Sequence, residues 1–157
     1  MTRSGIGYDL HRLVDGRPLV VGGITVPFEK GPVGHSDGDA LAHAICDALL
    51  GAAGAGDIGT HFPDTDPKWQ GAASLKFLEH VRTLVDARGW KIAYIDAVVI
   101  CERPRLGPHF PAMREALARA LGVGADRVHL KAKTNEGVDA VGRGEAIAAH
   151  AIATLES

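Results

Sequence analysis

The stretch GHSDGDALAHAICDALLGAAGAG, residues 34–56, predicts a helix around which the rest of the fold is organised. Ser36 stands three residues before Asp39, which is a carboxylate variant of the capping box. Apolar residues follow at helical spacing until a run of glycines ends the pattern. We therefore expect a helix over residues 38–53 with Ser36 as its N-cap.

Strand and helix patterns alternate on both sides of this helix. Two β-branched runs meet at Gly22-Gly23, which predicts a hairpin over residues 17–27. Apolar spacing predicts helices over residues 74–89 and 109–122, and strands over residues 91–102 and 127–136. This alternation indicates a fold of the α/β or α+β class.

Two further segments have weaker patterns. Residues 56–72 are rich in Gly, Pro and Asp and lack periodicity, so we expect a long ordered loop. Residues 144–157 are ambiguous, because their alanines favour a helix while alternate positions from 147 to 153 would form one face of a strand. Local rules alone favour the helix.

Composition limits the class of protein. A chain of 157 residues has the size of one domain, and we expect a single domain over residues 1–157. No apolar stretch approaches the length of a bilayer span, and the scattered basic residues with a net charge of −2 argue against a nucleic-acid partner. Cys46 and Cys101 lie singly in apolar runs and are interpreted as buried thiols. Without an export signal, we expect a cytoplasmic protein.

The segment GYDLHRL, residues 7–13, places a carboxylate and an imidazole two positions apart on an expected strand. Side chains at i and i+2 share one face of a strand, so Asp9 and His11 point to the same side. His43 on the predicted helix is the obvious third ligand for a divalent transition metal such as zinc. The alternative is a hydrogen-bonded Asp-His pair with a separate core histidine, and spacing alone does not decide between the two.

The loops beside these residues carry a resemblance to a known family. The segments GHSDGDALAH and GDIGTHFPDTDP, together with the N-terminal Asp-x-His, closely resemble the 2-C-methyl-D-erythritol 2,4-cyclodiphosphate synthase family of the non-mevalonate isoprenoid pathway. The resemblance extends through RPRLGPHFPAMR and KAKTNE to GRGEAIA, and so covers essentially the whole chain. It implies zinc, or another divalent transition metal, bound by Asp9, His11 and His43.

The resemblance also implies a reaction. In this family the 2-phosphate of 4-diphosphocytidyl-2-C-methyl-D-erythritol 2-phosphate attacks the β-phosphorus of the same molecule, which closes a cyclic diphosphate and expels CMP. No water is consumed, so the implied enzyme is a phosphorus-oxygen lyase that depends on divalent metals.

The resemblance assigns the substrate contacts residue by residue. Glu136 matches a residue that holds Mg²⁺ or Mn²⁺ at the substrate phosphates, and Thr134 matches one that fixes those phosphates. His35 and Ser36 are expected at a phosphate because they begin the predicted helix, whose N-terminus favours anions. Asp57 is expected to bind the erythritol hydroxyls, and Thr134, Glu136, His35 and Asp57 are the implied catalytic residues. The other implied contacts are Ile58, Gly59, Phe62, Asp64 and Asp66 in the erythritol loop, Cys101, Pro104, Arg105 and Leu106 in the cytidine pocket, and Lys133, Asn135 and Arg143.

The same resemblance implies a homotrimer in which adjacent subunits share each active site. One mixed β-sheet per subunit would be covered by helices on one face, with the three sheets packed around the trimer axis and residues 144–157 forming a strand. We follow this implication against the local preference for helix, because tertiary context overrides propensity.

Four positions depart from the family pattern. Asp139 and Ala140 replace a glycine-aromatic pair, Lys133 stands where a threonine is common, and His150 stands where a glutamate often faces the axis. These departures leave open whether the axial cavity holds an isoprenoid diphosphate. Two other functions also remain open, a zinc hydrolase that activates water and a metal-binding trimer without activity.

Overall fold

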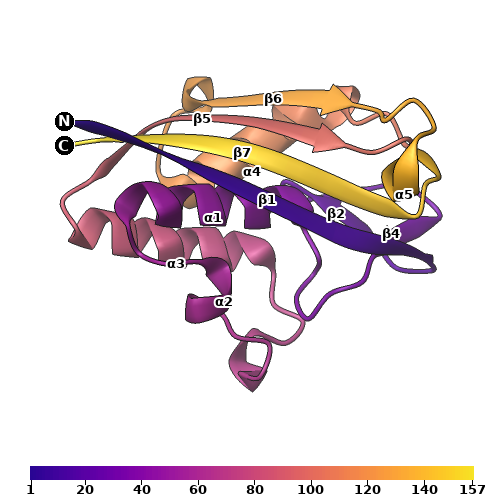
Figure 1. Cartoon of the computed structure of the whole chain (residues 1–157), viewed down its shortest axis with the longest axis horizontal. Helices are drawn as coiled ribbons and strands as arrows, with labels where there is room; N and C mark the ends of the chain where they lie inside the picture. Colours follow the sequence, from indigo (N-terminus) through magenta and orange to yellow (C-terminus); the bar gives the residue numbers. More distant parts are fainter.

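The computed structural model describes residues 1–157 and is built around a sheet in which the two ends of the chain lie side by side (Figure 1). β1 (Thr2–Asp15) and β7 (Ala146–Glu156) pair antiparallel over most of their lengths. β7 also pairs antiparallel with β5 (Lys91–Ile100), which pairs parallel with β6 (Val128–Lys133). β4 (Lys30–Pro32) adds to the free edge of β1, giving the strand order β4-β1-β7-β5-β6.

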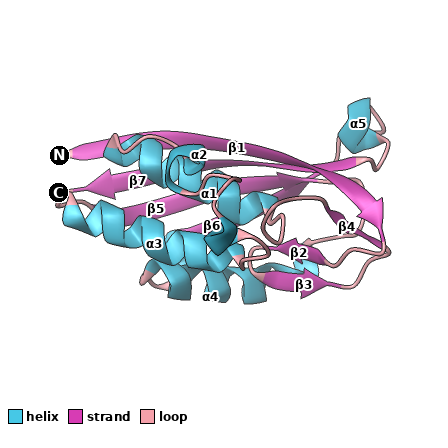
Figure 2. Cartoon of the chain, turned by 90° about the horizontal axis from the view of Figure 1, so that it is seen from below, coloured by secondary structure: helices cyan, strands magenta, loops and turns pink.

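Three long helices cover one face of this mixed sheet (Figure 2). α1 (Ala40–Ala53) packs directly on β1 and β7, and α3 (Ser74–Ala87) packs between α1 and α4 (Phe110–Leu121). The predicted fold, a mixed sheet with helices on one face, is confirmed. The short elements are β2 (Leu19–Val21), β3 (Ile24–Val26), α2 (Ile58–His61), η1 (Pro67–Trp69), η2 (Gly107–His109), η3 (Ala125–Arg127) and α5 (Asp139–Gly142).

Two glycines let α1 lie directly against β1. A Cβ atom on Gly5 would fall 2.1 Å from the Ala48 carbonyl oxygen, and one on Gly7 would fall 1.8 Å from the Ala44 carbonyl oxygen. Any side chain at either position would therefore push the helix away from the strand. This close approach sets the distance between the side chains that β1 and α1 direct toward each other.

The ambiguous C-terminal run is strand β7, so the local preference for helix is wrong and the strand implied by the resemblance is confirmed. Ile147, Ala149, Ala151 and Ala153 are buried beneath the helices, whereas His150 is exposed on the opposite face. Small alanine side chains fit the narrow space under α1, which explains a composition that otherwise favours a helix.

The other face of the sheet carries only the short helix α5, at one end of β7 (Figure 2). It exposes large apolar side chains, and His150 lies with its ring centroid 4.8 Å from that of Tyr8. The exposed apolar residues of these strands include Ile6, Tyr8, Leu10, Tyr94 and Ile152. A bare apolar sheet face of this kind is typical of a surface that packs against other chains. No helix has the length and hydropathy to cross a membrane.

Two local predictions need correction. The N-cap of α1 is Asp39 rather than Ser36, and the helix begins at Ala40. The Asp39 carboxylate accepts hydrogen bonds from the backbone nitrogens of Ala42, Gly22 and Gly23, so it joins the β2–β3 hairpin to the helix. Residues 56–72 are not a plain loop, because the short helices α2 and η1 lie within them and are capped by Asp57 and Asp66.

Candidate metal centre and active site

Asp9, His11 and His43 converge at the contact between β1 and α1. Asp9 and His11 project from β1 toward the helices, while Tyr8 and Leu10 project to the bare face, as the strand pattern predicts. His11 Nε2 lies 2.7 Å and His43 Nδ1 lies 3.1 Å from Asp9 Oδ2. The two imidazole nitrogens are 3.3 Å apart. One carboxylate oxygen and two ring nitrogens therefore face a common point.

This donor set fits a divalent transition metal. Tetrahedral zinc with bonds of about 2.0–2.2 Å places neighbouring ligand atoms about 3.3 Å apart. The observed separations of 2.7, 3.1 and 3.3 Å need only small adjustment to reach that geometry. Three protein ligands leave a fourth position for an oxygen of a substrate, which is the arrangement of catalytic rather than structural zinc.

Contacts behind His11 orient its ring. His11 Nδ1 lies 2.7 Å from the Val33 carbonyl oxygen, so Nδ1–H donates to that oxygen and Nε2 is the atom that faces Asp9. Burial opposes the charged form of His11, but the hydrogen bond and charge of Asp9 outweigh it and raise the pKa of His11. Burial likewise opposes the Asp9 carboxylate, but hydrogen bonds with His11 and His43 outweigh it and lower the pKa of Asp9.

His43 is held on its other side by Ser36 and by Ser74 and Phe77, which the sequence did not indicate. Its Nε2 lies 2.8 Å from Ser74 Oγ and 3.2 Å from Ser36 Oγ. The Phe77 ring stacks on the imidazole with centroids 5.7 Å apart, and Ser74 Oγ also hydrogen-bonds to Asp37. Ser36 is thus a buried neighbour of His43 rather than a cap of α1.

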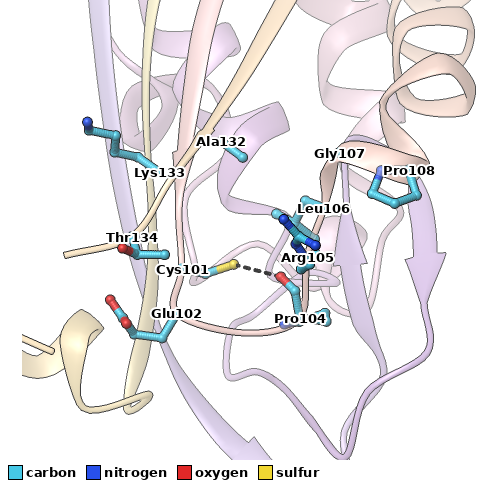
Figure 3. A pocket seen from close by; sticks show the side chains of 10 residues that line it. All are labelled: Cys101, Glu102, Pro104, Arg105, Leu106, Gly107, Pro108, Ala132, Lys133 and Thr134. Carbon is cyan, nitrogen blue, oxygen red and sulfur yellow. Dashed lines mark hydrogen bonds between the residues drawn. The ribbon is translucent and has the colours of Figure 1, made fainter. Parts of the chain in front are cut away.

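A pocket of about 480 Å³ lies at the carboxyl ends of β5 and β6 (Figure 3). Cys101, Lys133 and Thr134 line it from the strands, and the loop with Pro104, Arg105 and Leu106 faces them. Six of the predicted substrate contacts therefore meet in one pocket. Glu102, Gly107, Pro108 and Ala132, which the analysis of the sequence did not name individually, complete it.

The Cys101 thiol is part of this pocket wall as well as of the core. Its Sγ donates to the Pro104 carbonyl oxygen over 3.7 Å, which holds the loop against the end of β5 (Figure 3). Burial, assisted by the charge of Glu102, raises the pKa of Cys101 to about 11. Cys46 lies fully inside the core, so both predicted buried thiols are confirmed.

Residues 57–66 form a separate folded segment. Asp57 caps α2 by accepting hydrogen bonds from the Thr60 amide and hydroxyl, and Ile58 N donates to Asp47 Oδ1 on α1 over 2.7 Å. Asp47 thereby fixes the beginning of α2, which carries Ile58 and Gly59. Phe62 stacks on Phe77 with centroids 4.4 Å apart, so this segment is linked through aromatic contacts to His43.

The rest of this segment contacts the chain before α1. His35 Nε2 lies 3.3 Å from the Asp66 carbonyl oxygen, and the Asp66 side chain caps η1. Asp64 lies between α2 and η1 in the chain and is exposed. The segment and the residues preceding α1 therefore lie on the same side of the molecule as the metal centre.

Residues that follow β6 lie apart from the metal centre. Glu136 is exposed and has a positive φ of 54°, and its amide donates to Thr134 Oγ1 over 3.3 Å. The Asn135 amide nitrogen donates to Glu102 Oε1 over 2.6 Å, which ties this turn to the end of β5. Arg143 is exposed and pairs with Glu145 at 3.1 Å. Neither Glu136, Asn135 nor Arg143 lines the pocket.

One chain thus carries two groups of predicted site residues that are not in contact. The metal centre is on β1 and α1, whereas the pocket is at the ends of β5 and β6, with β7 between β1 and β5. No residue of the metal centre lines the pocket.

Comparison with known proteins identifies the family. The model of the YgbB family matches residues 2–156. The chain belongs to the YgbB family. A relative from Pelobacter propionicus, named 2-C-methyl-D-erythritol 2,4-cyclodiphosphate synthase, is 56% identical over 153 residues, which cover 98% of this chain and 97% of the relative. The family resemblance stated from the sequence is therefore confirmed.

Solved structures named as cyclodiphosphate synthase or IspF share the fold. One is a 2C-methyl-D-erythritol-2,4-cyclodiphosphate synthase in a CDP-bound form, with a TM-score of 0.90 and 45% identity over 98% of this chain and 100% of that one. Another is a CDP complex of IspF from Plasmodium falciparum, with a TM-score of 0.85 and 30% identity over 98% of this chain and 95% of that one. Both neighbours were solved with a cytidine nucleotide.

Proposed function

We propose that residues 1–157 act as one domain that converts 4-diphosphocytidyl-2-C-methyl-D-erythritol 2-phosphate to 2-C-methyl-D-erythritol 2,4-cyclodiphosphate and CMP. The observation that carries this proposal is the Asp9, His11 and His43 centre in a chain that matches synthases over 98% of its length. The 2-phosphate attacks the β-phosphorus, the bond from that phosphorus to the oxygen of CMP breaks, and no water is consumed. The enzyme is therefore a lyase of the non-mevalonate isoprenoid pathway.

Asp9, His11 and His43 would hold zinc or a similar divalent ion. Such an ion supplies a Lewis acid and a template that neutralises phosphate oxygens during phosphoryl transfer. The Val33 carbonyl oxygen keeps the His11 ring with Nε2 toward this point, and Asp9 supplies the negative charge. By holding such an ion, these three side chains would position the reacting phosphates, because charge neutralisation and alignment supply most of the catalysis in phosphoryl transfer.

The pocket at the ends of β5 and β6 is the proposed cytidine site. It is concave, and its volume of about 480 Å³ falls within the usual range for small-molecule sites. Arg105 and Lys133 provide cations for the diphosphate, and Thr134 provides a hydroxyl. Two structural neighbours were solved with CDP, which supports a cytidine nucleotide as a ligand of this fold.

Glu136 and the erythritol segment complete the proposed site. Glu136 would hold Mg²⁺ or Mn²⁺ at the phosphates, next to Asn135 and Arg143. Asp57, with its oxygens presented at the start of α2, would bind the erythritol hydroxyls, and Ile58, Gly59, Phe62, Asp64 and Asp66 would enclose that part of the substrate. His35 and Ser36 remain proposed phosphate contacts, although the Ser36 hydroxyl is engaged by His43 and the helix N-terminus is capped by Asp39.

A homotrimer accounts for the separation of the two groups within one chain. In a cyclic assembly, different surfaces of adjacent subunits meet, so the metal centre of one subunit can face the pocket of the next. The bare apolar sheet face, with Ile6, Tyr8 and Ile152, supports such packing. Ala140 packs against Ala146 and Ala148 on the same face of β7 as His150, where both would influence whether an axial cavity binds an isoprenoid diphosphate.

Two variants separate the roles of the metal sites. His43→Ala is expected to lose bound zinc and CMP release together, whereas Glu136→Ala is expected to retain zinc and lose Mg²⁺-dependent turnover. The measurements are zinc content by elemental analysis and CMP release by chromatography. Stoichiometric zinc in His43→Ala would show that the ligand assignment is wrong.

Mixing inactive variants tests the shared site. His43→Ala disables the metal half and Thr134→Ala the pocket half, so co-expressed subunits should form mixed trimers in which some sites are intact. Random assembly of equal amounts predicts about a quarter of the wild-type activity, because each site takes its halves from two subunits. Absence of any recovered activity in confirmed mixed trimers would place both halves of the site in one subunit.

A further inference from the structure

A chain of hydrogen bonds runs from the side of His43 that faces away from Asp9 and His11, through Ser74, to Asp37. The buried Ser74, the first residue of α3, lies 2.8 Å from His43 Nε2 through its Oγ. The same hydroxyl hydrogen-bonds to Asp37 Oδ1, and the Ser74 backbone nitrogen donates to Asp37 Oδ2 over 2.9 Å. The Asp37 carboxylate therefore accepts hydrogen bonds from both the hydroxyl and the backbone N–H of Ser74.

The direction of each bond in this chain is determined by the groups involved. A carboxylate only accepts hydrogen bonds, so Ser74 Oγ–H donates to Asp37. With its proton used there, Ser74 Oγ accepts, and His43 Nε2–H must be the donor to it. With Nε2–H donated to Ser74, a cation held between Nδ1 and Asp9 would take the place of a proton on Nδ1, so Nδ1 would offer its lone pair to that cation. Nδ1 is the atom that faces Asp9 and His11.

We propose that Ser74 and Asp37 are positioning residues that hold His43 in the Nε2–H tautomer, with the Nδ1 lone pair aimed at the metal. This inference rests on the metal centre of the proposed function. It extends that centre to Ser74, 31 residues after His43, and to Asp37, which lies just before α1. The Asp37 charge, transmitted through Ser74, also strengthens electron donation from the ring to a bound cation.

Ser36 does not perform this task. Its Oγ accepts from the Gly38 backbone nitrogen over 3.3 Å and is 3.2 Å from His43 Nε2, a longer contact than that of Ser74. It has no contact with a carboxylate that would fix the direction of its proton. Ser36 therefore fills the space beside the ring, while Ser74 determines its tautomer.

The first test is the state of the His43 ring, measured by ¹⁵N-¹H correlation spectra of the full-length, zinc-loaded protein. The wild type is expected to show His43 protonated at Nε2, with this proton hydrogen-bonded. In Asp37→Asn, the amide nitrogen can donate to Ser74, which frees the serine proton to compete for Nε2, so the Nε2–H signal should shift and exchange faster with water. A wild-type His43 without a proton on Nε2, or an Nε2–H signal unchanged by Asp37→Asn, would overturn the proposal.

The second test is zinc affinity, measured by competition with a chromogenic chelator, together with the absorption spectrum of the cobalt-substituted protein. Ser74→Ala is expected to weaken zinc binding by about 10–100-fold and to alter the cobalt bands, with a smaller loss for Asp37→Asn. Val85→Ala is the matched control, because it removes buried atoms from the same helix without a contact to His43.

The outcomes distinguish this inference from the proposed function. Equal affinity in wild type and Ser74→Ala, or an equal loss in Val85→Ala, would overturn the positioning role while leaving the metal site intact. Failure of the wild type to bind zinc or cobalt would instead contradict the proposed function. Should Ser74→Ala fail to fold, Asp37→Asn and the wild-type tautomer still decide the question.

Discussion

Gly7 on β1 lies against the backbone of Ala44 on α1, at the residue next to the metal-facing His43. A Cβ atom at Gly7 would stand 1.8 Å from the Ala44 carbonyl oxygen. We predict that Gly7→Ala forces the helix outward and lowers the free energy of unfolding by about 3 kcal/mol, the upper part of the usual range for overpacking. Urea denaturation measures this loss. Because α1 carries His43, zinc affinity should fall in the same variant.

Gly51→Ala is the control for that prediction. Gly51 lies in the same helix, and its nearest neighbour to an added Cβ, Gly5 Cα, is at an ordinary 3.9 Å. Replacing an exposed glycine in a helix interior by alanine raises the free energy of unfolding by about 0.5–1 kcal/mol. A Gly7→Ala protein with the same unfolding midpoint as Gly51→Ala would show that the close approach of α1 to β1 is not required.

The pattern of the sequence predicts this helix and the strand beside it, but not their exact fit. Ser36 was expected to cap α1 because it has the right spacing to a carboxylate, whereas Asp39 caps it. Asp39 prevails because its buried carboxylate also accepts from Gly22 and Gly23, contacts that exist only once the hairpin has folded. Residues 146–156 form a strand although their alanines favour a helix, for a similar reason: only small side chains fit under α1.

The Cys101 thiol should resist alkylation. Burial and the charge of Glu102 raise its pKa to about 11, so the reactive thiolate is scarce near neutral pH. At about pH 8, its thiolate fraction, and with it the rate of labelling by iodoacetamide, should be about 200-fold lower than for an unperturbed thiol with a pKa of about 8.5. Mass spectrometry of the labelled peptides measures the rate, and Cys101→Ser identifies the peptide.

The rate for Cys101 should increase about tenfold per pH unit until the pH approaches its pKa. Because Cys101 lines the proposed cytidine pocket, CDP should slow the labelling further. Fast labelling at neutral pH would contradict the burial of the Cys101 thiol. A labelling rate unchanged by saturating CDP would contradict the assignment of the pocket to the nucleotide.

Asp96 on β5 should stabilise the fold in a pH-dependent way. The hydrogen bond from Lys131 at 2.9 Å outweighs partial burial and, with His129, holds the pKa of Asp96 below its usual 3.8. A pKa that is lower in the folded state stabilises the fold above the unfolded value and ceases to do so as the pH falls through the folded value. Asp96→Asn should therefore be less stable than wild type at neutral pH and equal to it well below pH 3.8.

Urea titrations of both proteins from neutral to acid pH measure that convergence. Lys131→Ala should reduce the pH dependence in the same region, because it removes the principal partner of the carboxylate. A constant difference between wild type and Asp96→Asn throughout the acid range would show that the ion pair does not stabilise the fold. Since the side chain of Asp96 is 38% exposed, high salt should weaken the effect.

The candidate site shows the same limits of prediction as the fold. Asp9 and His11 follow from alternation along a strand, and His43 follows from its place on a helix, so the metal centre is accessible to sequence reasoning. Ser74 is not, because nothing near it marks it as a partner of His43, which lies 31 residues earlier. Such contacts depend on how α3 packs against α1, and only the folded chain reveals them.

The central claim is that this chain cyclises its substrate rather than hydrolysing it. The most direct measurement is phosphorus NMR of the purified protein with 4-diphosphocytidyl-2-C-methyl-D-erythritol 2-phosphate and Mg²⁺, before and after chelation. We predict the coupled signals of a cyclic diphosphate together with CMP, and their loss when metals are removed. Release of inorganic phosphate would instead indicate a hydrolase, and unchanged substrate would indicate a metal-binding protein without this activity.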